Sequence, residues 1–190
     1  MTSILKVDSI QNSAGTSAMT IDSSGKVTGS VNDSRQCAMG FMRTSSVSGD
    51  QNPVSGFVNM ATQLSSDSAG EITRGGSVSH SSGIFSVPFT GLWQVEYFIT
   101  LNSSASDATI QVNIDTTQDN SSYSSLIQAK ESVPASGNKS HMSMKAFWKV
   151  TNTSNDKLKF VHASFASHSA EGDTSVALTY CLFTWLGDAD

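Results

Sequence analysis

Large apolar side chains alternate with polar ones between Gly83 and Leu101, and this alternation is the strongest structural signal in the chain. The apolar members are Trp93, Val95, Tyr97, Ile99 and Leu101, and the polar members between them are Gln94, Glu96 and Thr100. A period of two residues is typical of a β-strand that turns one face toward a core and the other toward solvent. The segment therefore predicts a half-buried strand that belongs to a sheet.

Comparable segments recur beyond this strand, about every 10 to 15 residues, which is the spacing of an all-β sandwich. The clusters FTG, SSASD, TTQDNSS, SGNKS, NTSND and SAEGD separate them and are rich in turn-forming residues. No segment shows a helical period. Residues 44–80 have a weaker pattern, in which Ser and Gly loops surround short apolar pieces at 54–60 and 72–78. We interpret these pieces as loop-rich edge strands.

Two late segments carry apolar side chains on both faces. In residues 175–186, one face would hold Val176, Leu178, Tyr180, Leu182 and Leu186, and the other Ala177, Cys181, Phe183 and Trp185. In residues 142–150, Phe147 lies among polar residues on the face opposite an apolar row. One face can fill the core, but a soluble monomer rarely exposes a second apolar face of this size. The pattern therefore predicts that subunits associate.

The first 30 residues differ from the rest of the chain. Residues 4–31 contain three short alternating pieces, interrupted by the turn-forming sequences NSAG and DSSG. Such pieces bury too little apolar surface to order themselves, so we expect an arm ordered by other chains or by a docking surface. A flexible tail is the alternative. A polar hinge at 32–36 precedes the first core strand at 37–42, so we divide the chain into an arm, 1–34, and a head, 35–190.

Charge and hydropathy exclude several classes of partner. The 190 residues carry a net charge of -5, whereas nucleic-acid binding requires a basic face. No apolar run approaches the roughly 20 residues that span a bilayer, and the start of the chain lacks the pattern of a signal peptide. We expect a soluble chain with no nucleic-acid partner and no membrane insertion.

The sequence shows no catalytic, cofactor or metal site. The four histidines lack a ligand spacing, no serine lies in a nucleophile elbow, and the segment from Asp115 to Asp119 is better explained as a solvated loop than as a Ca²⁺ site. A glycan-active enzyme would need a carboxylate pair in a cleft, and the acidic residues of the strands are thinly spread. Cys37 and Cys181 are too few for a disulfide framework, so we expect two buried free thiols.

The residues Gly83, Phe85, Pro88, Gly91, Leu92, Trp93, Val95, Tyr97 and Ile99 form the order G-x-F-x-x-P-x-x-G-L-W followed by V-x-Y-x-I. This order resembles the central signature of C1q-like domains, which are relatives of tumour necrosis factor, and CLFTWLGDAD resembles their closing strand. The resemblance covers about residues 36–188. It implies an all-β jelly-roll sandwich that assembles as a homotrimer, with the interface predicted at Phe147, Tyr180, Phe183 and Trp185. It also implies that the strands of Cys37 and Cys181 are neighbours, which makes a bridge conceivable, although we keep the free-thiol interpretation.

No Gly-X-Y collagen repeat precedes the head, unlike in animal C1q-like proteins. The opening LKVDSIQNSAGTSAMTIDSSGKV instead resembles the N-terminal segments of fibre and minor structural proteins of tailed bacteriophages, particularly marine and cyanobacterial ones. Together the two resemblances imply a non-enzymatic virion protein, a fibre or a capsid decoration, whose arm docks on capsid or tail proteins. The alternative is a fibre-tip adhesin that contacts host glycans through the loops at 102–107 and 115–125, and a secreted bacterial C1q-like binding protein is a further possibility.

Overall fold

The structure is a computed structural model, and it describes residues 9–11, 17–21, 27–29, 36–64, 72–73, 76–103, 108–133, 137 and 139–189. The chain divides into two compact units, Met1–Ser34 and Arg35–Asp190. In the first unit, an antiparallel three-stranded sheet is formed by β1 (Ser9–Gln11), β2 (Ser17–Ile21) and β3 (Val27–Gly29). The docking role of this arm stays a prediction.

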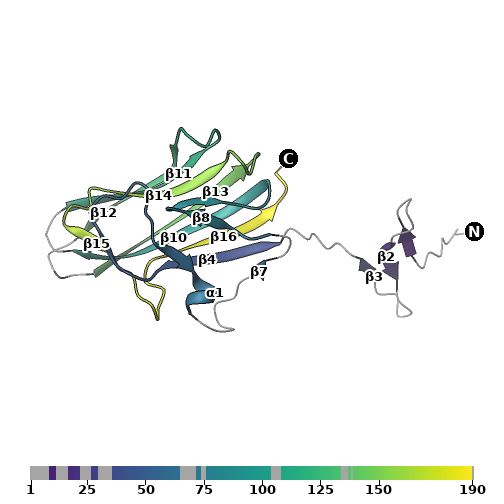
Figure 1. The fold of residues 1–190 in the computed structure, drawn as a ribbon, viewed down its shortest axis with the longest axis horizontal. Coiled ribbons are helices and arrows are strands. Elements are labelled where there is room, and N and C mark those ends of the chain that lie inside the picture. Colours follow the sequence, from purple (N-terminus) through teal and green to yellow (C-terminus); the bar gives the residue numbers. More distant parts are fainter. Residues whose placement is uncertain are drawn as a thin grey trace, which may run out of the picture. The chain divides into compact units, whose positions relative to one another are not determined.

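The second unit contains two antiparallel sheets, which face each other as the two layers of a sandwich (Figure 1). The eight-stranded sheet comprises β5 (Val47–Ser48), β15 (His168–Ala170), β10 (Gly91–Ser103), β16 (Tyr180–Gly187), β4 (Cys37–Arg43) and β6 (Phe57–Asn59), with β13 (Lys139–Val150) paired to β10 and β7 (Ile72–Thr73) paired to β4. The five-stranded sheet comprises β12 (Ser124–Val133), β11 (Ala108–Thr117), β14 (Lys157–Ala163), β9 (Ile84–Ser86) and β8 (Ser79–Ser81). Within the described residues the head is a β-sandwich with one short helix, which confirms the all-β prediction.

Strand β10 lies in the middle of the eight-stranded sheet. It pairs with β13 along one edge, and with β16 and then β15 along the other. Its inward residues Trp93, Val95, Tyr97 and Ile99 are almost completely buried. The alternation therefore marks the core face correctly. Burial of each large apolar side chain contributes roughly 1.5–3 kcal/mol to stability, so this strand is a principal source of the fold's stability.

The middle of the core is a cluster of phenylalanine rings contributed by both sheets. Phe41 and Phe183 belong to the eight-stranded sheet, Phe85 and Phe160 belong to the five-stranded sheet, and Phe57 comes from β6. Ring centroids in this cluster lie 5.0–6.4 Å apart, as between Phe85 and Phe183 at 5.0 Å. Tilted and edge-on contacts at these distances are favourable for aromatic pairs. The cluster fixes the two sheets against each other.

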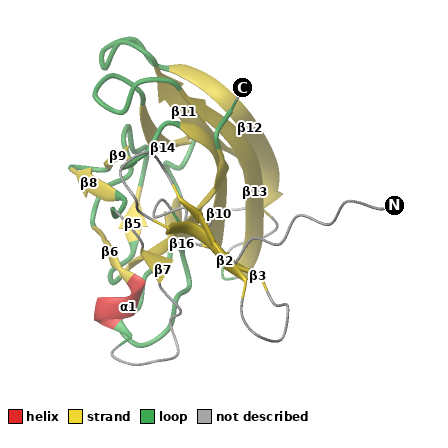
Figure 2. Cartoon of the chain, turned by 90° about the vertical axis from the view of Figure 1, so that its right-hand side faces the viewer, coloured by secondary structure: helices red, strands yellow, loops and turns green. Residues whose placement is uncertain are grey.

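A short helix, α1 (Met60–Gln63), follows β6 where the sequence predicts only an edge strand (Figure 2). The Asn59 side chain starts the helix by accepting hydrogen bonds from the backbone N–H groups of Ala61 and Thr62. A single capped turn has no helical hydrophobic period, so the pattern cannot reveal it. The expected edge strands are present as β6 and β7, which pair with opposite ends of β4.

The last strand begins later than its sequence suggests. The Asp173 carboxylate accepts hydrogen bonds from the N–H groups of Ser175 and Val176, which bends the chain before β16. Val176 is 57 % exposed and lies outside the strand. The prediction that Val176 and Leu178 continue one face of this strand is therefore wrong, because a local turn replaces the extended backbone there.

Neither cysteine forms a disulfide bond and both are buried, as predicted. Their strands β16 and β4 are neighbours, as the family resemblance implies, but Cys181 lies opposite Phe41 in the register. Cys37 is four residues further along β4, which is roughly 13 Å at the rise of a strand, and a disulfide requires Cα atoms within about 7 Å. Burial raises the pKa of the Cys181 thiol well above its ordinary value. Neither thiol can bridge the other in this fold.

Candidate functional site

The outward side of the eight-stranded sheet carries apolar side chains on three neighbouring strands, among them the charged pair of Glu96 and Lys145, and we call this surface the aromatic face. It is formed on β10, β13 and β16 by Leu92, Phe98, His141, Phe147, Tyr180, Leu182 and Leu186. The inward side chains of these strands already fill the core. The aromatic face is therefore apolar surface in addition to what the sandwich needs.

Helix α1 covers the neighbouring outward side of β4, which limits how far the aromatic face extends. Gly40 makes this close approach possible, because a Cβ there would lie 2.6 Å from the Met60 sulfur and 2.9 Å from a Leu182 methyl group. Met42, the next outward residue of β4, is completely buried. The exposed apolar side chains of the aromatic face therefore lie beyond β4, on β13 and β16.

Three rings from three strands form a stack at the centre of this face. The rings of His141 and Phe98 lie 5.7 Å apart at 23°, and those of Phe98 and Tyr180 lie 5.1 Å apart at 19°. His141 is further held by a 3.3 Å contact between its Nδ1 and the Thr100 hydroxyl. Aromatic pairs of this kind contribute about 0.5–1.5 kcal/mol beyond their burial. The stack therefore gives the face a fixed shape.

Phe147 is the most exposed large apolar side chain of the face, with 58 % of its surface in contact with solvent. It lies on β13 opposite Gln94, and Lys145 and Lys149 flank it on the same side of the strand. Lys145 is paired with Glu96 of β10 at 2.8 Å. At the end of β16, Leu186 is also exposed, at 48 %. Exposed large apolar residues on a rigid sheet favour contact with another protein surface.

A hollow of about 220 Å³ opens in the aromatic face beside Ser143. It is lined by Glu96, Tyr97, Phe98, Ser143, Met144, Lys145 and Tyr180. Ser143 pairs with Phe98 in the β10–β13 register and is much smaller than its neighbours on β13, His141 and Lys145. A small side chain between larger ones leaves the hollow open. Rings therefore bound it on one side and the Lys145–Glu96 ion pair on the other.

Of the four predicted interface residues, Phe147 and Tyr180 lie on the aromatic face and Phe183 does not. Phe183 is completely buried in the core, where it contacts Phe41 and Phe85. Its assignment to the interface is therefore wrong, because β16 turns Cys181 and Phe183 inward when it pairs with β10. Phe98 was not predicted as an interface residue. It could have been found, because Phe98 is an apolar residue on the outward side of β10, which also carries the polar residues Gln94 and Glu96.

Trp185 also lies toward the core side, opposite Trp93. Its Nε1 donates a hydrogen bond to the Thr90 carbonyl at 3.1 Å, and its ring lies edge-on to Phe89 at 5.9 Å. A hollow of about 300 Å³ adjoins it, lined by Gln36, Cys37, Ala38, Thr184 and Trp185. Trp185 therefore borders the end of the sandwich and is separate from the aromatic face.

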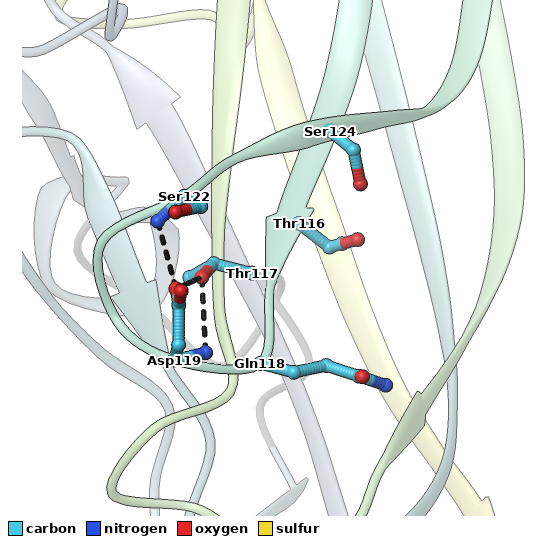
Figure 3. A pocket seen from close by; sticks show the side chains of 6 residues that line it. All are labelled: Thr116, Thr117, Gln118, Asp119, Ser122 and Ser124. Carbon is cyan, nitrogen blue, oxygen red and sulfur yellow. Dashed lines mark hydrogen bonds between the residues drawn. The ribbon is translucent and has the colours of Figure 1, made fainter.

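A second surface feature lies at the turn between β11 and β12, within the loop predicted to be exposed. A polar hollow of about 540 Å³ is lined there by Thr116, Thr117, Gln118, Asp119, Ser122 and Ser124 (Figure 3). One oxygen of Asp119 accepts hydrogen bonds from the Thr117 hydroxyl and from the N–H groups of Ser121 and Ser122. These bonds hold the pKa of Asp119 well below its ordinary value. The turn is thus fixed by its own carboxylate, and no group of three or more metal-ligating side chains occurs in the part of the chain that the structure describes.

A buried polar pair lies inside the sandwich. The Tyr97 hydroxyl and His162 Nε2 are 2.8 Å apart, and both residues are almost completely buried. Burial, with a smaller contribution from the Arg43 charge, lowers the pKa of His162 to about 3. His162 lies in the core because it follows Leu158 and Phe160 in the inward series of β14 (Lys157–Ala163). The pair is structural, since it has no access to solvent.

Among the described residues, no helix is both long enough and apolar enough to cross a membrane. No protein-family model matches the chain, and no curated protein matches its sequence.

Solved structures share the fold of the head. The structure of Eiger TNF from S. frugiperda superposes with a TM-score of 0.64 at 16 % identity, covering 82 % of this chain and 96 % of that one. The crystal structure of murine APRIL at pH 5.0 gives a TM-score of 0.58 at 11 % identity, covering 80 % of this chain and all of that one. The chain therefore has the TNF-like jelly-roll fold that its sequence signature implies. Identities this low carry the fold alone.

Proposed function

We propose that this TNF-like jelly roll is the head of a non-enzymatic structural protein of a tailed-bacteriophage virion, either a fibre or a capsid decoration. Three copies associate through the aromatic face, and the N-terminal arm docks the trimer on capsid or tail proteins. The observation that carries the proposal is the apolar surface on the outward side of a sheet whose inward side already fills a core. The virion assignment is supported by the resemblance of the first 30 residues to phage structural proteins.

The gain from covering the aromatic face can be worked out for its most exposed residue. An aromatic side chain buries about 150–250 Å², and Phe147 still exposes 58 % of its surface. At about 25 cal/mol per Å², covering the remainder contributes roughly 2–3.5 kcal/mol per subunit. Phe98, Tyr180, Leu182 and Leu186 add to this gain. A trimer buries three such surfaces, and their combined gain opposes the roughly 4–15 kcal/mol that each association costs in lost freedom of motion.

The trimer is tested by light scattering coupled to size-exclusion chromatography at micromolar concentration. Three chains of 20.1 kDa correspond to about 60 kDa. A folded wild-type monomer at that concentration contradicts the assembly proposal. The variant Ser132→Trp adds a large apolar residue at an exposed position of β12, in the other sheet, and serves as a control for surface substitutions. We expect it to keep the mass of the trimer.

The virion role is tested on purified particles. Antibodies against the head, detected by gold labelling in electron microscopy, locate the protein on the shell, the collar or the fibre tips. A fibre places the label at the tail and a decoration places it over the shell. Absence of the chain from particles, by labelling and by mass spectrometry, contradicts the virion proposal and leaves the assembly proposal standing.

A fibre-tip adhesin is the second candidate, and the hollow at the β11–β12 turn favours it. Every side chain that lines the hollow can donate or accept a hydrogen bond, which suits a polyhydroxylated ligand such as a host surface glycan. Loops held on a rigid sandwich are common recognition sites. The test is a glycan array probed with the wild-type head and with the Gln118→Ala and Ser124→Ala variants. Equal binding by all three proteins contradicts a site in this hollow.

A further inference from the structure

The hollow beside Ser143 is sized for one amino-acid side chain. Its volume is about 220 Å³, whereas sites for drug-sized molecules enclose about 300–1,000 Å³. Lys145 and Glu96 neutralise each other on its rim at 2.8 Å, so the hollow presents no unpaired charge to an ionic ligand. Phe98 and Tyr180 supply ring surface to its wall. An apolar or aromatic side chain is therefore the occupant that these walls suit.

The chain also carries a side chain of this kind on the same face. Phe147 protrudes from β13 with 58 % of its surface exposed and does not line the hollow. Four residues separate Phe147 from Ser143 along one strand, which is roughly 13 Å. The ring of Phe147 therefore cannot enter the hollow of its own chain. It can enter only the hollow of another copy.

We infer that Phe147 of one copy inserts into the hollow beside Ser143 of the next copy. This inference rests on the proposed trimer and names the contact that holds it together. In the proposed trimer each copy gives its Phe147 to one neighbour and receives Phe147 from the other, so the contact is heterologous and the threefold rotation closes it into a ring. Inside the hollow, the Phe147 ring meets Phe98 and Tyr180, whose mutual stacking keeps the wall in place.

The first test fills the hollow without touching Phe147. Ser143 is exposed in the middle of a strand, so the variant Ser143→Trp leaves the core unchanged and places a large ring where the partner's Phe147 would lie. We expect its trimer dissociation constant to rise at least tenfold, with an unchanged circular dichroism spectrum. If the Ser143→Trp protein forms a trimer as stable as that of the wild type, the inferred contact is wrong. The proposed assembly then still stands, because the wild-type protein is a trimer in the same experiment. The Ser132→Trp variant is the control for added bulk on the other sheet.

The second test records the contact directly and does not depend on the first variant folding well. In the double variant Ser143→Cys/Phe147→Cys, the new thiols of one chain are too far apart to bridge, and the native cysteines are buried. Mild oxidation is carried out at concentrations where light scattering shows a trimer. We expect a covalent trimer on a non-reducing gel, and no covalent trimer from either single variant. Trimers of the double variant that oxidise without forming this cross-link overturn the inference.

Discussion

Mild acid should destabilise the head through the buried histidine of β14. His162 is 1 % exposed and its pKa is lowered to about 3, whereas the same side chain in the unfolded protein titrates near 6.5. Below pH 6.5 the unfolded chain therefore binds a proton that the folded chain does not. The contribution of neutral His162 to the free energy of unfolding is complete above pH 6.5 and is lost progressively as the pH falls toward 3.

The size of this effect follows from proton linkage. The free energy of unfolding falls by about 1.4 kcal/mol per pH unit for one proton. Between pH 7 and pH 4.5, the two pKa values give a loss of about 2.5 kcal/mol from this residue alone. Since a small domain is stable by about 5–15 kcal/mol, such a loss is readily measured.

The assay compares urea unfolding of the wild type and of a His162→Gln variant at pH 7 and pH 4.5, at one protein concentration. Glutamine keeps a polar group near the Tyr97 hydroxyl but cannot take up a proton. Carboxylates that also titrate in this range act equally in both proteins and cancel in the comparison. We expect the wild type to lose about 2.5 kcal/mol more than the variant. Equal losses, to within about 0.5 kcal/mol, would refute a buried, neutral His162.

Three further predictions follow from the placement of individual side chains. Phe147→Asp should give a folded monomer by light scattering, because it replaces the most exposed apolar ring of the aromatic face with a charge; a trimer of wild-type stability would contradict the role of that face. Phe183→Ala should lower the free energy of unfolding by about 3–5 kcal/mol through a core cavity, and a loss below about 1 kcal/mol in urea titrations would contradict its burial. Cys181 should react with a thiol reagent only after denaturation, since burial raises its pKa and excludes the reagent; fast labelling of the native protein would contradict this.

Much of the fold could be predicted from the local pattern of apolar, polar and turn-forming residues. The two-residue period of β10 identified its core face, because alternate side chains of any strand point to opposite sides of a sheet. The turn-forming clusters between the late strands predicted the sandwich. Like the alternation, they depend only on residues that are neighbours in the sequence. Helix α1 and the bend at Asp173 were missed because each is one turn held by a single capping side chain.

The functional surface required long-range information. Where both faces of a strand are apolar, as in β16, alternation identifies two faces but cannot say which one the other sheet covers. Pairing with β10 and β4 turned Phe183 inward and left Tyr180 outward. The stack of His141, Phe98 and Tyr180 joins three strands that are distant in the chain. The sequence shows which side chains are apolar. The register between the strands brought these rings together, and that register depends on the packing of the whole sandwich.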